Sequence, residues 1–287
     1  MLTIVVPAWN EEAAVAATVA AALGVGAQIG AAVEVLVVDD GSTDATAARA
    51  EGAGARVIRH PCNLGYGAAL KTGIRAATYD EIAMTDCDGT YPLSALPALL
   101  AARASGFDLA IGARQGRHLD SSAYKQVMRT LLKQIVQFTT GQRIPDVNSG
   151  LRVFSRRDVT PLLPHLSNAF SFTTSQTLAY LMTGRFVVWL PIDYAARLGK
   201  TKVRIVRDSL RTLQYITEAL LVYNPLKLFL MVAIALAGVG VVGALALACT
   251  GHWLTWLAIW LATASGVFAL GLAAYAIRGR ARGPGGE

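Results

Sequence analysis

The chain has 287 residues, of which 54% are apolar and 16% are charged, and its formal net charge is +7. The apolar content excludes a disordered chain, and three cysteines are too few for a disulfide scaffold. The length fits one large domain or two small ones, and apolar residues gather toward the C-terminus, which disfavours a purely soluble protein.

Residues 2–6 are an apolar run that predicts a short buried strand, ended by Pro7. The start of the chain lacks a basic segment followed by a long apolar one, so we expect no targeting signal. Asn10 is placed to cap a helix that runs to about Leu23, with two glutamates, beginning at Glu11, in its first turn. Two carboxylates at this place would repel a pyrophosphate, which disfavours a dinucleotide-binding domain.

The alternation of apolar strands and helices continues to about residue 112. Strands are predicted at 33–38, near 57–58, at 81–85 and at 109–112, with helices after Thr43, at 64–77 and at 94–104. Strand–helix repeats of these lengths predict a parallel sheet with helices on both faces. The expected fold class is therefore α/β.

Asp39 and Asp40 end the second predicted strand, at the edge where open parallel sheets bind ligands. A carboxylate at this edge could accept the imide N–H of uracil or the N–H groups of guanine. The alternative is a helix cap with a spare acid, since Ser42 or Thr43 could cap the next helix.

Asp86 and Asp88 follow the fourth predicted strand. Alternate residues of an extended segment point the same way, so both carboxylates could face one ligand. Oxygen ligands at this spacing suit Mg²⁺ or Mn²⁺ held between the protein and a diphosphate.

Two stretches, 120–140 and 204–222, have the apolar spacing of amphipathic helices, with basic residues on another face. Each could be an ordinary surface helix, but the apolar segments that follow favour helices lying on a bilayer. Most basic residues lie beside apolar segments, so an anionic membrane surface or a phosphate ligand is favoured over nucleic acid.

Residues 228–249 and 253–277 contain no charged side chain. At 1.5 Å per residue the first would reach about 33 Å, enough to cross a hydrocarbon core, and a short turn would join the two in a hairpin. A buried hydrophobic hairpin would need a larger core than this chain can build. Lys227 precedes the hairpin and arginines follow it, which predicts both ends in the cytoplasm. Glycines inside the first span are compatible with close packing in a homo-oligomer.

Six segments, in order over residues 1–155, resemble the inverting family 2 glycosyltransferases. They are Pro7-Ala8-Trp9-Asn10-Glu11-Glu12, Val37-Val38-Asp39-Asp40-Gly41-Ser42-Thr43-Asp44, Asn63-Leu64-Gly65-Tyr66-Gly67, Asp86-Cys87-Asp88-Gly89-Thr90-Tyr91-Pro92, Ile111-Gly112-Ala113-Arg114 and Asp146-Val147-Asn148-Ser149-Gly150-Leu151-Arg152. With the C-terminal hairpin, the chain resembles the branch of dolichyl-phosphate mannose synthase and the bacterial polyprenyl-phosphate glycosyltransferases. The resemblance implies a glycosyltransferase A-type, Rossmann-like domain that binds a nucleotide-diphospho-sugar.

The resemblance also implies roles for residues of the acidic loops. Pro7, Glu11 and Asp40 would contact the base and the ribose of the donor. Asp86 would contact the sugar nucleotide, and Asp88 would hold Mg²⁺ or Mn²⁺ against its diphosphate.

Arg197, Lys200 and Lys202 lie in a segment that is similar to the family's Arg-x-Gly-x-Ser-Lys loop, with Thr201 in place of Ser. A cationic loop of this kind could close over a diphosphate or a lipid phosphate. The alternative is a juxtamembrane loop that binds anionic lipid, and both roles can hold at once.

Three further residues are candidates by the same resemblance. Arg114 and Arg129 would bind the acceptor phosphate, and Asp146 would orient the nucleophile. A lipid phosphate is already mostly ionised near neutral pH, because its second pKa is roughly 6, so it needs little help from a base. Direct in-line attack at the anomeric carbon would invert the configuration.

Two places depart from the family pattern. Thr90 stands where relatives often have Gln near the metal, and residues 171–176 lack the glutamates that many relatives carry there. The first departure changes the expected surroundings of the metal. The second leaves the contacts to the sugar or the acceptor undefined.

We therefore predict a metal-dependent, inverting hexosyltransferase of the inner membrane that moves one sugar from a UDP- or GDP-sugar to a polyprenyl phosphate. Its parts would be a catalytic domain at 1–203, an amphipathic helix at 204–225, a transmembrane hairpin at 226–278 and a cytoplasmic basic tail at 279–287. One alternative is a glycosyltransferase that acts on a membrane lipid hydroxyl and so needs a true base. The other is a non-catalytic membrane scaffold that binds nucleotide sugars, against which the intact Asp86 and Asp88 pair argues.

Overall fold

A computed structural model describes residues 1–115, 130, 134, 136–138, 140–195, 214, 217, 218, 220, 221 and 224–281. The chain divides into two compact units, Met1–Tyr215 and Ile216–Glu287. Most of the two predicted amphipathic helices lies outside the described residues, and so does the predicted domain boundary at 203. The same holds for Arg129, Arg197, Lys200 and Lys202, whose roles stay predictions.

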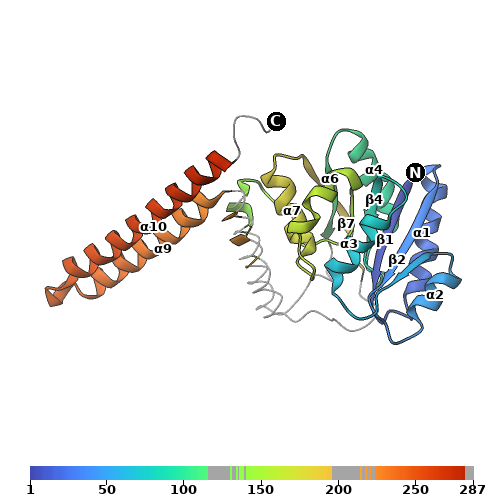
Figure 1. The fold of residues 1–287 in the computed structure, drawn as a ribbon, viewed down its shortest axis with the longest axis horizontal. Coiled ribbons are helices and arrows are strands. Elements are labelled where there is room, and N and C mark those ends of the chain that lie inside the picture. The colour runs from blue at the N-terminus through green and yellow to red at the C-terminus, as the bar shows by residue number, and fades with distance from the viewer. Residues whose placement is uncertain are drawn as a thin grey trace. The chain divides into compact units, whose positions relative to one another are not determined.

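The first unit is built on one sheet of seven strands in the order β3-β2-β1-β4-β6-β5-β7 (Figure 1). The strands are β1 (Leu2–Ala8), β2 (Val33–Asp39), β3 (Arg56–Arg59), β4 (Glu81–Met84), β5 (Leu109–Gln115), β6 (Arg152–Ser155) and β7 (Val187–Asp193). Neighbouring strands are parallel, except that β6 runs antiparallel to both β4 and β5. The strands predicted within residues 1–112 run parallel to one another, as expected. The sheet is nevertheless mixed, because β6, which lies beyond that pattern, runs against its neighbours.

Helices cover both faces of this sheet, as the alternation predicted (Figure 1). They are α1 (Val15–Ile29), α2 (Thr46–Gly52), α3 (Tyr66–Ala76), α4 (Leu96–Ala104), α6 (Arg156–Val159) and α7 (Phe172–Met182), with short 3₁₀ turns at Leu93–Ala95 and Thr160–His165. Successive residues of β1 serve opposite faces: Ile4 packs with α1 and α4, and Val5 packs with α3 and α7. Two apolar layers therefore sandwich the sheet.

The first turn of the chain differs from its predicted form in two ways. Pro7 does not end the strand but pairs with Val38 inside it. Asn10 does not cap a helix; it adopts a φ of 51°, and α1 begins five residues later and runs on to Ile29. Likewise, neither Ser42 nor Thr43 caps α2, which begins at Thr46. The polar groups of these two loops bond to each other instead, as the site geometry shows.

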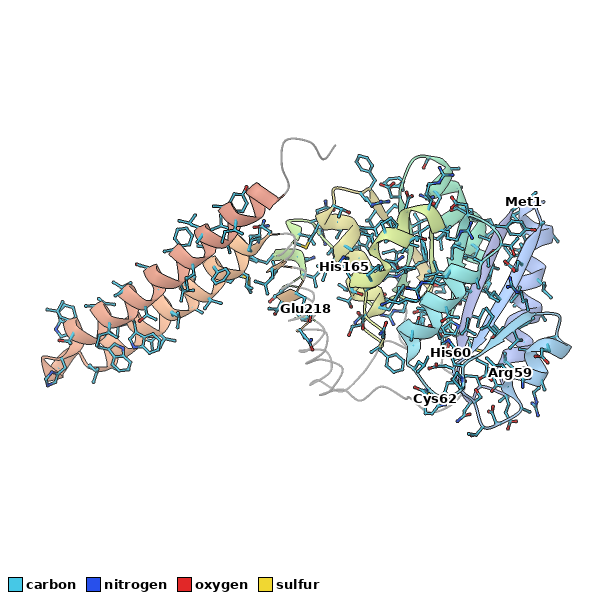
Figure 2. All side chains as sticks on the ribbon, in the orientation of Figure 1. Met1, Arg59, His60, Cys62, His165 and Glu218 are labelled. Atoms are coloured by element: carbon cyan, nitrogen blue, oxygen red, sulfur yellow. The ribbon has the colours of Figure 1, made fainter. Side chains whose placement is uncertain are left out.

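The second unit is a helical hairpin of α9 (Pro225–Ala246) and α10 (Trp253–Ala281), joined through a 3₁₀ turn at Ala248–Thr250. Each helix has a stretch long and apolar enough to cross a bilayer, Pro225–Ala246 and Trp253–Ile277, by length and composition. Apolar side chains stand out along both helices (Figure 2).

Large side chains of one helix fill glycine positions on the other. A side chain on Gly243 would overlap Trp256, one on Gly240 would overlap Trp260, and one on Gly271 would overlap Phe229. Gly240 and Gly243 lie in the first span, whose glycines were considered for association between copies. Both instead contact α10 inside the hairpin, where the absence of a side chain lets the two helices approach each other.

Candidate active site

Five candidate residues from distant parts of the chain come to one edge of the sheet. The carboxyl ends of β1, β2, β4 and β5 meet there, and Glu11, Asp40, Asp86 and Arg114 lie at or just after these ends. Because β6 is antiparallel, its amino end lies at the same edge and delivers Asp146 in the preceding loop. The mixed sheet thus builds the edge where open α/β folds bind ligands.

The loops after β1 and β2 are bonded to each other. The backbone N–H of Asn10 donates to Ser42 Oγ at 2.8 Å, and that of Glu11 donates to Thr46 Oγ1 at 2.8 Å. In return, Asn10 Oδ1 accepts from the N–H of Thr43 at 2.9 Å. These bonds fix the backbone that carries Glu11, while Pro7 lies buried in the strand just before it.

Asp40 is 3% exposed and its carboxylate holds the next loop. Its Oδ1 accepts from the backbone N–H of Leu64 at 2.9 Å and its Oδ2 from that of Gly65 at 2.8 Å, while His60 Nδ1 lies 2.7 Å from Oδ1. Gly41 makes the turn at a φ of 72°, with the backbone of Cys62 pressed against it. Asp40 therefore orders this loop, and its contact with a base stays a prediction.

Asp86 and Asp88 lie at the site in different surroundings. Asp88 is 3% exposed, and its Oδ1 accepts from Thr90 Oγ1 at 2.6 Å and from the Thr90 N–H at 3.2 Å. Asp86 is half-buried, and its Oδ1 accepts from the hydroxyl of Tyr66 at 2.7 Å. Thr90, the departure from the family pattern, thus orients the Asp88 carboxylate.

The surroundings of these carboxylates are acidic and offer oxygen donors. Burial raises the pKa of the Cys87 thiol, and the charges of Glu11, Asp88 and Asp86 raise it further. Within the part of the chain that the structure describes, no three His, Cys, Asp or Glu side chains gather to hold a metal. A cation at Asp86 and Asp88 would need further oxygens from a ligand such as a diphosphate, and the carboxylate donors fit Mg²⁺ or Mn²⁺.

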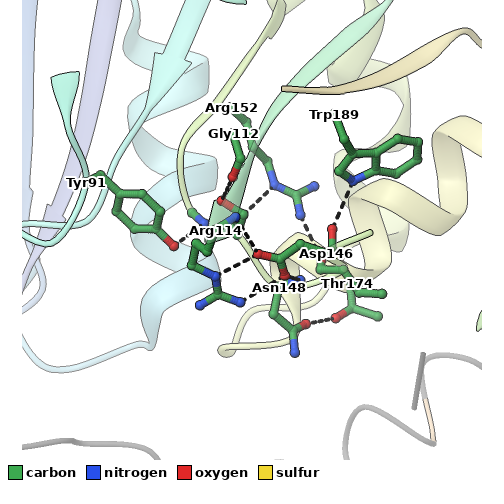
Figure 3. A network of polar contacts seen from close by, with 11 residues as sticks. Tyr91, Gly112, Arg114, Asp146, Asn148, Arg152, Thr174 and Trp189 are labelled. Carbon is green, nitrogen blue, oxygen red and sulfur yellow. Dashed lines mark hydrogen bonds and ion pairs between the residues drawn. The ribbon is translucent and has the colours of Figure 1, made fainter. Parts of the chain in front are cut away.

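Arg114 and Asp146 form a two-pronged ion pair (Figure 3). Arg114 Nε donates to Asp146 Oδ2 at 2.7 Å, and the terminal nitrogen donates to Oδ1 at 2.9 Å. The backbone N–H groups of Arg114 and Asn148 donate to the same carboxylate at 3.2 and 3.0 Å. Burial alone would raise the pKa of Asp146, but the hydrogen bonds and charge of Arg114 lower it overall. Asp146 is therefore an ionised carboxylate whose oxygens are engaged.

A second arginine, Arg152, lies wholly buried behind this pair at the start of β6 (Figure 3). It donates to the carbonyl oxygens of Ser149 and Val147 at 2.8 and 2.9 Å and to Thr177 Oγ1 at 2.8 Å. Burial lowers the pKa of Arg152 to about 10. Arg152 also donates to Gln176 Oε1 at 3.3 Å, so it ties the Asp146 loop to the end of the stretch 171–176, which lacks the family's glutamates.

Aromatic residues frame the same edge. The N–H of Gly150 donates to the hydroxyl of Tyr91 at 2.6 Å, and Tyr91 meets the ring of Tyr194 edge-on at 5.2 Å. The guanidinium of Arg114 lies over Tyr194 at 5.4 Å. The N–H of Ala195 donates to the Thr90 carbonyl at 3.0 Å, so Ala195 lies beside the loop that carries Asp86 and Asp88.

Sequence reasoning missed Tyr66, Tyr91, Tyr194 and Arg152 as parts of the site. Three of them lie within or next to the quoted segments, but nothing local distinguishes a tyrosine that bonds to a carboxylate from one in a core. Each has at least one partner 20 or more residues away, as Tyr66 has in Asp86 and Arg152 has in Thr177.

A model of the family described as glycosyl transferase family 2 matches residues 3–161 of the chain. An undecaprenyl-phosphate 4-deoxy-4-formamido-L-arabinose transferase of Pseudomonas fluorescens is 29% identical, over 86% of this chain and 72% of that protein. The enzyme of the same name from Klebsiella pneumoniae is 28% identical, over 79% and 69%.

Among solved structures, the fold is similar to glucosyl-3-phosphoglycerate synthase from Mycobacterium tuberculosis. The complex with Mn²⁺, uridine diphosphate and glucosyl-3-phosphoglycerate gives a TM-score of 0.60 at 21% identity, covering 76% of this chain and 79% of that one. A complex with Mg²⁺ and uridine diphosphate gives a TM-score of 0.56 at 20% identity, covering 76% and 79%. At this level of identity, the likeness concerns the fold.

Proposed function

Since this chain belongs to glycosyl transferase family 2, we propose that it moves one sugar from a UDP- or GDP-sugar to a polyprenyl phosphate, with inversion at the anomeric carbon. The names of the relatives support this acceptor. The apolar hairpin supports it too, because a polyprenyl chain is held in a bilayer. These observations support a membrane lipid as the acceptor. They do not distinguish a phosphate nucleophile from a lipid hydroxyl.

The observation that carries the choice of acceptor is the bonding of Asp146. Among the described residues, its two oxygens accept four hydrogen bonds, three of them from Arg114. A general base needs a lone pair that faces the nucleophile and a pKa near the working pH. Asp146 has its lone pairs engaged and a lowered pKa. A phosphate nucleophile, which needs no base, fits this site better than a lipid hydroxyl.

In the proposed reaction, an oxygen of the acceptor phosphate forms a bond to the anomeric carbon of the donor sugar. The bond from that carbon to the diphosphate oxygen breaks, and the nucleoside diphosphate leaves with the electron pair. Mg²⁺ or Mn²⁺ bound at Asp88 would neutralise charge on the diphosphate. Asp86 would contact the sugar nucleotide, and Pro7, Glu11 and Asp40 would lie at its base and ribose.

In this proposal Arg114 binds the acceptor phosphate. Its guanidinium is held by Asp146 and lies over the ring of Tyr194, so its position is fixed before any ligand arrives. A pre-positioned cation can bind a phosphate without a cost of rearrangement. Arg129 would assist at the acceptor phosphate, and Arg197, Lys200 and Lys202 would close over the donor diphosphate.

We place the catalytic unit and both termini on the cytoplasmic side of the inner membrane. Lys227 at the start of the hairpin and Arg278 and Arg280 at its end support this orientation, since cytoplasmic flanks are rich in basic residues. The same residues would contact anionic lipid headgroups.

The test is sugar transfer by the detergent-purified full chain. A panel of UDP- and GDP-sugars, including UDP-4-deoxy-4-formamido-L-arabinose because of the relatives' names, is mixed with undecaprenyl phosphate and Mg²⁺ or Mn²⁺. We expect one donor to give a glycolipid product that EDTA abolishes. We expect Asp88→Ala to lower turnover at least about a hundredfold, the scale on which a group that stabilises transition-state charge is lost.

Glu51→Ala is the matched control, because Glu51 is an exposed carboxylate paired only loosely with Arg59 at 3.3 Å. It should leave turnover unchanged. Product formed on a lipid hydroxyl instead of the phosphate would favour the first alternative. Nucleotide-sugar binding with no transfer to any lipid would favour a scaffold.

A further inference from the structure

Tyr66 connects the Asp86 carboxylate to a second part of the fold. Its hydroxyl donates to Asp86 Oδ1 at 2.7 Å, and its ring stacks on Phe170, with centroids 5.5 Å apart and planes 18° from parallel. Asp86 follows β4, Tyr66 opens α3, and Phe170 precedes α7. One side chain therefore joins three elements at the site edge.

The backbone on both sides of Tyr66 is fixed by close packing. A side chain on Gly65 or Gly67 would overlap the carbonyl oxygens of Asn168 or Ser167. The N–H of Ala68 donates to the same Asn168 oxygen at 3.1 Å. These contacts hold the start of α3 against the segment that carries Phe170, so the Tyr66 ring has little freedom to move.

Asp86 is limited from its other side as well. A side chain on Gly150 would come within 3.0 Å of both Asp86 oxygens, so the Gly150 backbone lies directly against the carboxylate. Gly150 is in turn bonded to the hydroxyl of Tyr91 at 2.6 Å. The Asp86 carboxylate thus lies between the Tyr66 hydroxyl, which donates a hydrogen bond to it, and the backbone of Gly150.

We propose that Tyr66 is a positioning residue that fixes the direction in which Asp86 meets the donor nucleotide, with Phe170 acting through the Tyr66 ring. This inference rests on the proposed function, in which Asp86 contacts the sugar nucleotide. A hydroxyl that bonds to one carboxylate oxygen selects one rotamer and directs the second oxygen away from itself.

The experiment measures the binding of UDP and of GDP, each with MnCl₂, by titration calorimetry on the full chain in detergent. Tyr66→Phe removes one hydroxyl and keeps the ring on Phe170. We expect the dissociation constant of the nucleotide that binds to rise about tenfold, as for the loss of a hydrogen bond to a charged group, while the melting temperature changes little.

Tyr180→Phe is the matched control. Tyr180 is a buried tyrosine whose hydroxyl has no hydrogen-bond partner among the described residues, so Tyr180→Phe removes a hydroxyl that holds no site carboxylate. Its loss should leave nucleotide affinity unchanged. Phe170→Leu should weaken binding a few-fold, and adding it to Tyr66→Phe should weaken binding no further, because Phe170 acts through the lost hydroxyl.

The outcomes separate the two proposals. If the wild-type chain binds neither nucleotide, the proposed function fails and this inference fails with it. Wild-type binding that Tyr66→Phe leaves unchanged would overturn the positioning role alone. A loss of affinity that comes with an equal loss in Tyr180→Phe, or with a large fall in melting temperature, would also overturn it.

Discussion

At the scale of single residues, the partner of a carboxylate decides what the carboxylate can do. Asp40 accepts hydrogen bonds from two backbone N–H groups and so orders a loop. Asp146 pairs with the guanidinium of Arg114, which fixes its carboxylate and makes it a weak base. Asp86 accepts a tyrosine hydroxyl. All three residues look alike in the sequence, where each is an acid in a loop after or before a strand.

The state of Asp146 leads to a prediction about pH. Its folded pKa is lowered, so its stabilising effect is complete above an unfolded value of about 3.9 and is lost only as pH falls through the folded pKa. Asp146 therefore does not titrate where the acceptor phosphate does, at roughly pH 6. We expect turnover to rise through about pH 6 and level off in both wild type and Asp146→Asn, with a lower plateau in the variant.

The measurement is kcat/KM for sugar transfer from pH 5 to 8.5. If the rise near pH 6 disappears in Asp146→Asn, then Asp146 is the titrating base and the choice of a phosphate acceptor loses its main support. Glu51→Gln, at an exposed carboxylate outside the site, should reproduce the wild-type profile.

At the scale of elements, close approach between backbones builds the site. The start of α3 packs against residues 167 and 168 so closely that only glycine fits at positions 65 and 67. The antiparallel β6 has the same kind of effect, because its direction brings residues 146–150 to the carboxyl edges of β4 and β5. Buried charged side chains support both arrangements: Lys71 of α3 donates to the Leu166 carbonyl at 2.5 Å, and Arg152 of β6 donates to the Val147 carbonyl at 2.9 Å.

Two glycine substitutions test the packing of α3. Gly67→Ala would overlap the Ser167 carbonyl and is expected to lower the free energy of unfolding by about 1–3 kcal/mol. Gly24 lies inside α1 with no atom within 4 Å of an added side chain, so Gly24→Ala should raise that free energy by up to about 1 kcal/mol. Thermal unfolding of both variants in detergent gives the comparison, and shifts of the same sign would contradict this packing.

At the scale of the whole molecule, the chain joins a catalytic unit to an apolar hairpin. Each helix of the hairpin leaves most of its apolar side chains uncovered within its own unit, which in water would be unfavourable and in a bilayer is not. The native cysteines report on the proposed orientation: Cys62 is exposed in the first unit, and Cys249 is exposed in the turn between the two helices.

We predict that a membrane-impermeant maleimide added to bacterial spheroplasts labels Cys249 and not Cys62. Inverted membrane vesicles should give the opposite result. Cys87 should react slowly in both, because it is buried and its thiol pKa is raised. Cys249→Ser and Cys62→Ser identify each signal, and labelling of Cys62 in intact spheroplasts would contradict the proposed topology.

Three features could be predicted from the residues alone: the alternation of strands and helices up to residue 112, the two apolar segments of the hairpin and the acidic residues at the strand ends. These features are local, because periodicity and composition are carried by contiguous residues. The sequence did not reveal the extension of β1 through Pro7 or the late start of α1, since both depend on bonds between loops some 32 residues apart.

The contacts between candidate residues depend on the three-dimensional fold and could not be predicted from the sequence. Arg114 contacts Asp146 across 32 residues of sequence because the strand order places β6 between β4 and β5. Tyr66 contacts Asp86 across 20 residues because α3 packs on β1, and β1 is the neighbour of β4 in the sheet. Strand order and direction follow from how apolar faces pack over the whole sheet. No short segment of sequence specifies strand order or strand direction, so the contacts within the site could not be predicted from local patterns.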